Sequence, residues 1–281
     1  MRVILSARYL YVRLAMWWVR CLEDLSPLSV GRVWISRSKG TLSHGSTVNR
    51  ASIERARGGL VVLIDSFAAP MFATNCWVLA SGRDSECIIV DPGMPDVSAQ
   101  LEAVLSRHNL KPVAIIATHG HLDHTFSIQP IADGYSIPAY IHSEDRAYLT
   151  APEKLLSAEF SSTVADMNFI EPTQVLELKN GEIINLVGLS FKAIHAPGHT
   201  RGSLMFQIDD EVLLSGDVLF AGSIGRTDLP TGSAKEMEET LRKKVVPLSD
   251  HLRVLPGHGP ETTMSYEKKN NPYLKSLVGR Y

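Results

Sequence analysis

Four potential metal ligands lie within six residues of the chain: His119, His121, Asp123 and His124. They directly follow residues 113–117, a short apolar run typical of a buried strand. Two histidines at positions i and i+2 of an extended loop can direct both imidazoles at one ion, and the Asp-His pair then lies where it could serve a second. Neutral imidazole and carboxylate suit zinc, and also iron or manganese. A polar loop that merely caps a helix is the alternative, but it does not require three histidines and an aspartate so close together.

Three further segments place a histidine or an aspartate at a turn that follows an apolar strand. His199 and His258 each follow a Pro-Gly pair, and Asp217 follows Ser-Gly. Such pairs set sharp turns at strand ends, where an α/β scaffold can direct side chains toward one point. Each segment alone fits an ordinary loop residue. Together with the first cluster they complete a set of seven potential metal ligands.

The apolar pattern predicts the elements that must position these residues. Apolar side chains at helical spacing predict a helix over residues 97–108, and a second helix is expected over residues 236–246. Short apolar runs predict strands at residues 59–65, 76–80, 87–91, 113–117, 191–194, 203–208, 211–214 and 253–255. Strands with interspersed helices in both halves predict two sheets packed together, with the helices outside.

The charge of the 281-residue chain is unevenly distributed. Residues 1–60 contain ten Lys/Arg and three Asp/Glu, a net charge of +7, whereas the remaining residues carry −9. This difference predicts a basic leader over residues 1–59 and a catalytic domain over residues 60–281. A leader rich in Arg and Ser and poor in acids is typical of an organelle-targeting segment. A disordered or spurious leader, translated from upstream of the true start, is the open alternative.

Composition also restricts the partners and the location of the protein. An acidic domain argues against nucleic acid as a partner. No run reaches the roughly 18 apolar residues of a membrane span. Three widely spaced cysteines, Cys21, Cys76 and Cys87, form no disulfide framework, which favours a reducing compartment and a cytoplasmic protein. The oligomeric state is left open.

With the ligand set complete, the sequence resembles the metallo-β-lactamase superfamily, whose signature is H-x-H-x-D-H followed by a His, an Asp and a His. The resemblance covers about residues 63–274. It implies an α/β fold, an αββα sandwich of two mixed sheets with external helices. Within the superfamily the chain is similar to glyoxalase II-like hydrolases, in the stretches at residues 197–200, 216–220, 225–228 and 256–260.

The resemblance also implies that two divalent metal ions are bound, zinc or else iron or manganese, and that each has three ligands and shares a bridging carboxylate. The first metal would be held by His119, His121 and His199. The second would be held by Asp123, His124 and His258. Asp217 would bridge the two. Two cations about 3.5–4 Å apart need an anionic bridge. Asp123 and Asp217 are therefore the expected catalytic residues, and Asp123 would also orient the attacking hydroxide. Arg226 would contact the substrate, with a surface salt bridge as the alternative role.

The expected function is hydrolysis of a thioester, such as S-lactoylglutathione or a related acyl-thiol, by a metal-bridging hydroxide. Only 23 residues follow His258, too few for the helical extension that helps two-domain glyoxalase II enzymes bind glutathione. The short single-domain type is therefore expected, and another thiol carrier is possible. Arg201 stands where related sequences often have proline. The rival function is that of a mononuclear iron persulfide dioxygenase, which shares the fold and the H-x-H-x-D-H motif.

Overall fold

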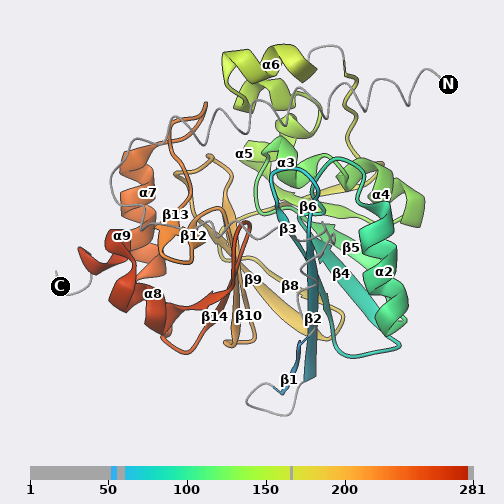
Figure 1. Cartoon of the computed structure of the whole chain (residues 1–281), viewed down its shortest axis with the longest axis horizontal. Coiled ribbons are helices and arrows are strands. Elements are labelled where there is room, and N and C mark those ends of the chain that lie inside the picture. The colour runs from blue at the N-terminus through green and yellow to red at the C-terminus, as the bar shows by residue number, and fades with distance from the viewer. Residues whose placement is uncertain (1–51, 56–60, 165–166, 278–281) are drawn as a thin grey trace, which may run out of the picture. The chain divides into compact units, whose positions relative to one another are not determined.

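Two mixed β-sheets form the framework of the protein (Figure 1). The computed structural model describes residues 52–55, 61–164 and 167–277. The first sheet has seven strands in chain order, antiparallel from β1 to β4 and parallel from β4 to β7. These strands are β1 (Ser52–Arg55), β2 (Val61–Ala68), β3 (Asn75–Ala80), β4 (Glu86–Val90), β5 (Lys111–Ile116), β6 (Ala139–His142) and β7 (Val175–Leu178).

The second sheet has six strands in the order β15-β14-β11-β10-β9-β8. Only the β11–β14 pair is parallel among the described strands of this sheet. Its strands are β8 (Ile183–Leu186), β9 (Leu189–His195), β10 (Leu204–Ile208), β11 (Val212–Gly216), β14 (Arg253–Pro256) and β15 (Thr262–Thr263). A separate two-stranded hairpin, β12 (Leu219–Phe220) and β13 (Ser223–Ile224), follows β11.

Alternation of side chains along the strands explains why the two sheets pack face to face. In β3, Trp77 and Leu79 belong to the core between the sheets, whereas Val78 faces the helices outside. In β10, Phe206 lies between the sheets and Met205 faces the opposite side. Because successive side chains of a strand point to opposite faces, each sheet is buried on both sides. This accounts for the continuous apolar runs of the sequence.

Helices cover the outer face of each sheet, which completes the predicted αββα sandwich. The first sheet is covered by α2 (Ser98–His108) and α4 (Ile128–Tyr135). The second is covered by α7 (Ala234–Thr240), its π-helical continuation η3 (Leu241–Val245), α8 (Met264–Asn270) and α9 (Pro272–Lys275). The other short helical segments described are α3 (Leu122–Thr125), α5 (Ser143–Arg146), η1 (Ala147–Leu149), η2 (Pro152–Leu155) and α6 (Ala158–Val164).

The eight strands expected from the sequence are all present, with ends shifted by a few residues, but regular structure begins earlier than expected. β1 pairs with β2 from Ser52 onward and forms the edge of the first sheet. The rest of the predicted leader, residues 1–51 and 56–59, lies outside the described residues and stays a prediction. Within the described residues, no helix is both long enough and apolar enough to cross a membrane.

Phe206 tests the core between the sheets, because its side chain is fully buried there. We expect Phe206→Ala to lower the free energy of unfolding by about 3–5 kcal/mol, through lost burial and the cavity left behind. Urea denaturation followed by circular dichroism would measure this. Ile183→Ala, at a side chain that is 56% exposed in β8, should cost less than about 1 kcal/mol. Equal losses for the two variants would contradict the assigned core.

Candidate metal centre

The seven predicted ligands come together at one edge of the sandwich, where β5, β9, β11 and β14 end. The turns after β11 and β14 are neighbours because these strands are parallel, and the Gly257 N–H donates to the Gly216 carbonyl at 2.9 Å. Across the sandwich, the Leu204 N–H donates to the Thr118 carbonyl at 2.7 Å. This contact joins the loop after β5 to the second sheet. Loops distant in sequence are therefore held side by side by backbone hydrogen bonds.

The first group of ligands consists of three buried histidines, His119, His121 and His199. Their facing nitrogens form a triangle: Nε2 of His119 is 3.1 Å from Nδ1 of His121, that atom is 2.7 Å from Nε2 of His199, and the third side is 3.2 Å. Ligands at 2.0–2.1 Å from a tetrahedral ion lie about 3.3 Å apart. The triangle therefore has nearly the dimensions of one face of a zinc coordination shell.

Hydrogen bonds on the outer side of these rings determine which nitrogen faces inward. His199 donates from Nδ1 to the Arg226 carbonyl at 2.8 Å. Nδ1 of His119 lies 3.0 Å from the Thr118 hydroxyl, which itself donates to Asp91 and so accepts from His119. The Nε2 atoms of both rings then present lone pairs to each other at 3.2 Å. A cation between them would relieve the repulsion of the two lone pairs.

The second group consists of Asp123, His124 and His258. Nδ1 of His124 donates to Asp91 at 3.0 Å, and Nδ1 of His258 donates to the Phe72 carbonyl at 3.1 Å. The Nε2 atoms of the two rings again face each other, at 3.2 Å. Oδ2 of Asp123 lies 3.2 Å from Nε2 of His258 and 3.5 Å from Nε2 of His124. One carboxylate and two imidazoles thus converge on a second point.

Asp217 lies between the two groups. Its Oδ2 is 3.5 Å from Nε2 of both His199 and His258, and its Oδ1 is 3.5 Å from Nε2 of His124. Oδ1 is buried, and no hydrogen-bond partner reaches it within the described part of the chain. A buried carboxylate oxygen without a donor is costly unless it binds a cation. This donor set fits two divalent ions that share one carboxylate.

Electrostatics distinguish the two groups. In the first, burial and then the neighbouring imidazoles lower the pKa of His119 and His121 well below the usual value, and burial lowers that of His199. These rings are therefore neutral at neutral pH. A neutral imidazole keeps the lone pair that a metal requires.

In the second group the carboxylates dominate. Burial alone would lower the pKa of His124, but Asp123, Asp217 and Asp91 raise it to about 10. Burial would raise the pKa of Asp123, but the field of His124 and His258 holds it well below its usual range. The acidic groups thus stay ionised and favour positive charge at this point. A divalent ion would supply that charge in place of protons.

Two buried aspartates support the ligand loops, and the sequence analysis assigned neither to the site. Asp91, at the end of β4, accepts hydrogen bonds from the Thr118 N–H at 2.8 Å, the Thr118 hydroxyl at 2.7 Å and His124 at 3.0 Å. It therefore orients ligands of both groups. The sequence did contain a signal for Asp91, because it directly follows a buried strand, as the ligand turns do. The Pro-Gly pair after it was interpreted only as the end of a strand.

The second supporting residue is Asp145, in α5, which has no exposed surface. Its carboxylate accepts from the Gly120 N–H at 2.8 Å, the Gly202 N–H at 2.8 Å and the Thr200 hydroxyl at 2.6 Å. It thereby fastens the loop of His119 to the loop of His199. No pattern in the sequence marks it, since Asp145 lies in an ordinary Ser-Glu-Asp-Arg helical turn.

Arg226 contributes through its backbone as well as its side chain. Its carbonyl orients His199, and its guanidinium forms a bidentate pair with Asp228, with two distances of 2.8 Å. The side chain is 49% exposed. Its charge is close enough to contribute, after burial and other neighbours, to lowering the pKa of His121. Both roles expected for Arg226, at the metal mouth and in a salt bridge, are therefore compatible with its position.

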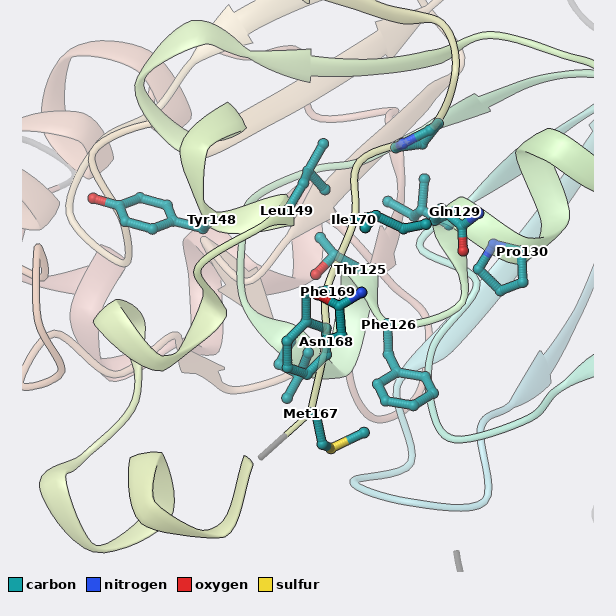
Figure 2. A pocket seen from close by; sticks show the side chains of 13 residues that line it. Thr125, Phe126, Gln129, Pro130, Tyr148, Leu149, Met167, Asn168, Phe169 and Ile170 are labelled. Carbon is teal, nitrogen blue, oxygen red and sulfur yellow. The ribbon is translucent and has the colours of Figure 1, made fainter. Parts of the chain in front are cut away.

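A separate apolar cavity of about 200 Å³ lies behind the ligand loop (Figure 2). Its lining includes Leu122 and Thr125 of α3 and the side chains of Phe126, Met167 and Phe169. The rings of Phe126 and Phe169 meet edge to face, with centroids 6.3 Å apart. None of its lining residues belongs to either ligand group, so the cavity is distinct from the metal centre.

Replacement of Asp217 tests whether one carboxylate serves both groups. We expect Asp217→Ala to bind about one metal ion per chain fewer than the unmodified protein and to lose turnover, because the remaining ligands lack an anionic bridge. Metal analysis after dialysis would measure the content. Asp228→Ala, an exposed aspartate nearby, should retain full metal content. An unchanged metal content in Asp217→Ala would contradict the bridging position.

Curated relatives are similar to this chain over most of their length. An uncharacterized protein of Mycobacterium tuberculosis is 40% identical over 223 residues, which cover 77% of this chain and 99% of that protein. The probable metallo-hydrolase YqgX of Bacillus subtilis is 33% identical over 209 residues, covering 72% and 93%. The hydroxyacylglutathione hydrolase GloC of Haemophilus influenzae is 31% identical over 214 residues, covering 76% and 98%.

Among solved structures, the BLEG-1 B3 metallo-beta-lactamase superposes with a TM-score of 0.65 at 33% identity, covering 75% of this chain and 99% of that one. The sequence pattern of the Metallo-beta-lactamase superfamily matches residues 69–258, which span all seven ligands. Fold, ligand geometry and sequence pattern agree, and the chain belongs to the metallo-β-lactamase superfamily.

Proposed function

We propose that this protein is a metal-dependent hydrolase that cleaves a thioester, S-lactoylglutathione or a related acyl-thiol. The observation that carries this proposal is the pair of three-ligand groups that share Asp217, with imidazole lone pairs facing one another at 3.2 Å. Its membership of the metallo-β-lactamase superfamily, and its similarity to the probable metallo-hydrolase YqgX, support hydrolysis as the reaction class. The similarity to GloC, a hydroxyacylglutathione hydrolase, supports the thioester as the substrate.

The group that the residues would hold is a pair of divalent ions, zinc in the first instance, with iron or manganese as alternatives. His119, His121 and His199 would hold one, Asp123, His124 and His258 the other, with Asp217 between them. When bound, such ions acidify water and polarise a carbonyl. The chain's own contribution is to fix seven donor atoms in place before the ions arrive.

Asp123 has the additional role of orienting the water that attacks. Its side chain is 22% exposed, whereas that of Asp217 is 9% exposed, so Asp123 is more open to solvent. The Thr74 hydroxyl donates to its Oδ2 at 3.0 Å, which restricts the rotation of the carboxylate. Because the pKa of Asp123 is held low, the carboxylate stays ionised and its oxygens accept hydrogen bonds from water. We therefore assign Asp123 and Asp217 as the catalytic carboxylates.

The leaving group favours a thioester over an amide. A thiol has a pKa of about 8.5, so a thiolate departs near neutral pH without first receiving a proton. An amine must be protonated to leave, and that requires a general acid. All seven titratable side chains that converge at the centre are assigned as metal ligands. A substrate that needs no proton donor suits such a site.

We also propose that residues 60–281, together with β1 in the first sheet, form the catalytic domain, and that the rest of residues 1–59 are a leader. A cytoplasmic location follows from the cysteine usage, with organelle targeting by the leader as the alternative. A small-molecule acyl-thiol is the proposed partner, because the acidic charge of residues 61–281 disfavours nucleic acid.

Metal analysis of the purified protein, combined with S-lactoylglutathione hydrolysis, tests the function. We expect about two metal ions per chain and release of a free thiol. One iron per chain, no hydrolysis, and O₂ uptake with a persulfide would instead make the protein a dioxygenase. Because BLEG-1 is named a B3 β-lactamase, nitrocefin is included. Its cleavage without thioester hydrolysis would contradict the proposal.

Arg226 is the proposed substrate contact, and replacement separates its side chain from its backbone role. We expect Arg226→Ala to raise KM about 10-fold, since a charge-assisted hydrogen bond contributes about 1.5 kcal/mol. Metal content should not change, because the carbonyl that orients His199 is retained. Arg83→Ala, at an exposed arginine in the β3–β4 turn, is the control. An unchanged KM would mean that the Arg226 side chain forms only its salt bridge with Asp228 and does not contact the substrate.

A further inference from the structure

The C-terminal helices hold two fully buried polar side chains whose hydrogen bonds reach none of the metal ligands. Glu267 in α8 and Asn271 at the start of α9 both have no exposed surface. A buried carboxylate is costly unless hydrogen bonds satisfy it. Oε1 of Glu267 accepts from the Thr262 hydroxyl at 2.7 Å, and Oε2 accepts from Asn271 Nδ2 at 2.8 Å and from the Gly222 N–H at 2.9 Å.

The side chains of Glu267 and Asn271 form hydrogen bonds with the turn of the β12–β13 hairpin. Besides the bond from Gly222 to Glu267, Asn271 Nδ2 donates to the Ser223 carbonyl at 3.0 Å. One backbone donor and one backbone acceptor of the turn are thus both engaged by the C-terminal helices. The hairpin lies beside α9 in the fold (Figure 1), and its turn reaches α8 through the bond from Gly222 to Glu267. Its position is therefore set from outside the metal centre.

The hairpin and the two residues that follow it lie against ligands of both groups. The Phe220 ring meets His258 edge to face, with centroids 6.0 Å apart. Directly after β13, Gly225 passes so close to Asp217 that a Cβ atom there would lie 1.8 Å from the Asp217 carbonyl oxygen. The next residue, Arg226, offers the carbonyl that accepts from His199. A displacement of the hairpin would move that carbonyl and release the His199 ring.

We propose that Glu267 and Asn271 are positioning residues of the metal centre, which act through the β12–β13 hairpin on the orientation of His199. This extends the proposed function, and rests on it only in that the centre binds metal. Outer partners that orient ligands typically change metal affinity by about 10–100-fold when they are replaced. The short C-terminal segment thus supports metal binding itself, besides covering the second sheet.

Affinity for Zn²⁺ alone, measured by competition with a chromogenic chelator, tests the proposal without any substrate. Glu267→Gln keeps the size of the side chain but replaces one acceptor oxygen with a donor. Asn271→Ser retains an oxygen that can cap α9, but it is too short to reach Ser223. We expect both variants to bind at least one Zn²⁺ about 10–100-fold more weakly, with a changed absorption spectrum of the Co²⁺-loaded protein.

Two controls separate positioning from general stability. Thr262→Val removes the contact of Glu267 within its own C-terminal segment and leaves the hairpin contacts intact. Glu261→Gln is the same substitution at a partly exposed glutamate nearby, which pairs with Arg253. We expect both to bind Zn²⁺ within about threefold of the unmodified protein. Circular dichroism would establish that each variant is folded.

Unchanged Zn²⁺ affinity in Glu267→Gln and Asn271→Ser would overturn the proposal. Equal weakening in all four variants would also overturn it, since the effect would then be general destabilisation. If Glu267→Gln does not fold, Asn271→Ser decides by the same criterion. Weaker Zn²⁺ binding in a protein that hydrolyses no thioester would support the positioning role and contradict the proposed substrate, so the two failures are distinguishable.

Discussion

The metal centre depends on one constraint, that an imidazole has two nitrogens and only the one without a proton can bind a metal. For four of the five histidines the structure satisfies this constraint by giving the outer nitrogen a hydrogen-bond acceptor. The acceptors are the Thr118 hydroxyl, the Asp91 carboxylate and the carbonyls of Arg226 and Phe72. The inner nitrogens then converge with their lone pairs opposed, and a cation resolves the resulting repulsion. Nε2 of His121 is buried and has no partner among the described residues, so the ring is positioned through its backbone and its neighbours.

Imidazole nitrogens whose lone pairs oppose one another require loops that keep their conformation when no ion is present. Rigidity comes from buried carboxylates that accept backbone N–H groups, because an acceptor with three donors defines position and direction together. Asp145 joins the loops of His119 and His199 in this way, and Asp91 joins β4 to the loop of His124. Burial of these charges is costly in isolation, yet each is fully hydrogen-bonded. The scaffold thereby maintains a geometry that the ligands alone would not adopt.

The sequence predicted the ligands and the layers better than it predicted their supports. H-x-H-x-D-H and the Pro-Gly and Ser-Gly turns are local patterns, so the seven side chains that meet in the structure could be named in advance. The apolar runs identified the central strands for the same reason. Seven of the described strands were missed because none of them is longer than four residues, and β7 and β8 are also partly exposed; they are β1, β6, β7, β8, β12, β13 and β15. Asp145 and Glu267 were missed because their partners, at residues 120, 202 and 222, are distant in sequence and are backbone atoms.

Where a backbone carbonyl orients a ligand, the side chain of the residue that carries it can take another role. Any residue at position 226 would offer His199 the same carbonyl, so the guanidinium of Arg226 is available for a different purpose. The carbonyl, however, must be in the right place, and nothing about the residue itself ensures that. Position is supplied through the hairpin by Glu267 and Asn271, whose side chains reach neither the metal ligands nor the solvent. Orientation of the ligands and the proposed contact with the substrate are thus encoded at different positions, so the side chain at position 226 can vary while the carbonyl that orients His199 is retained.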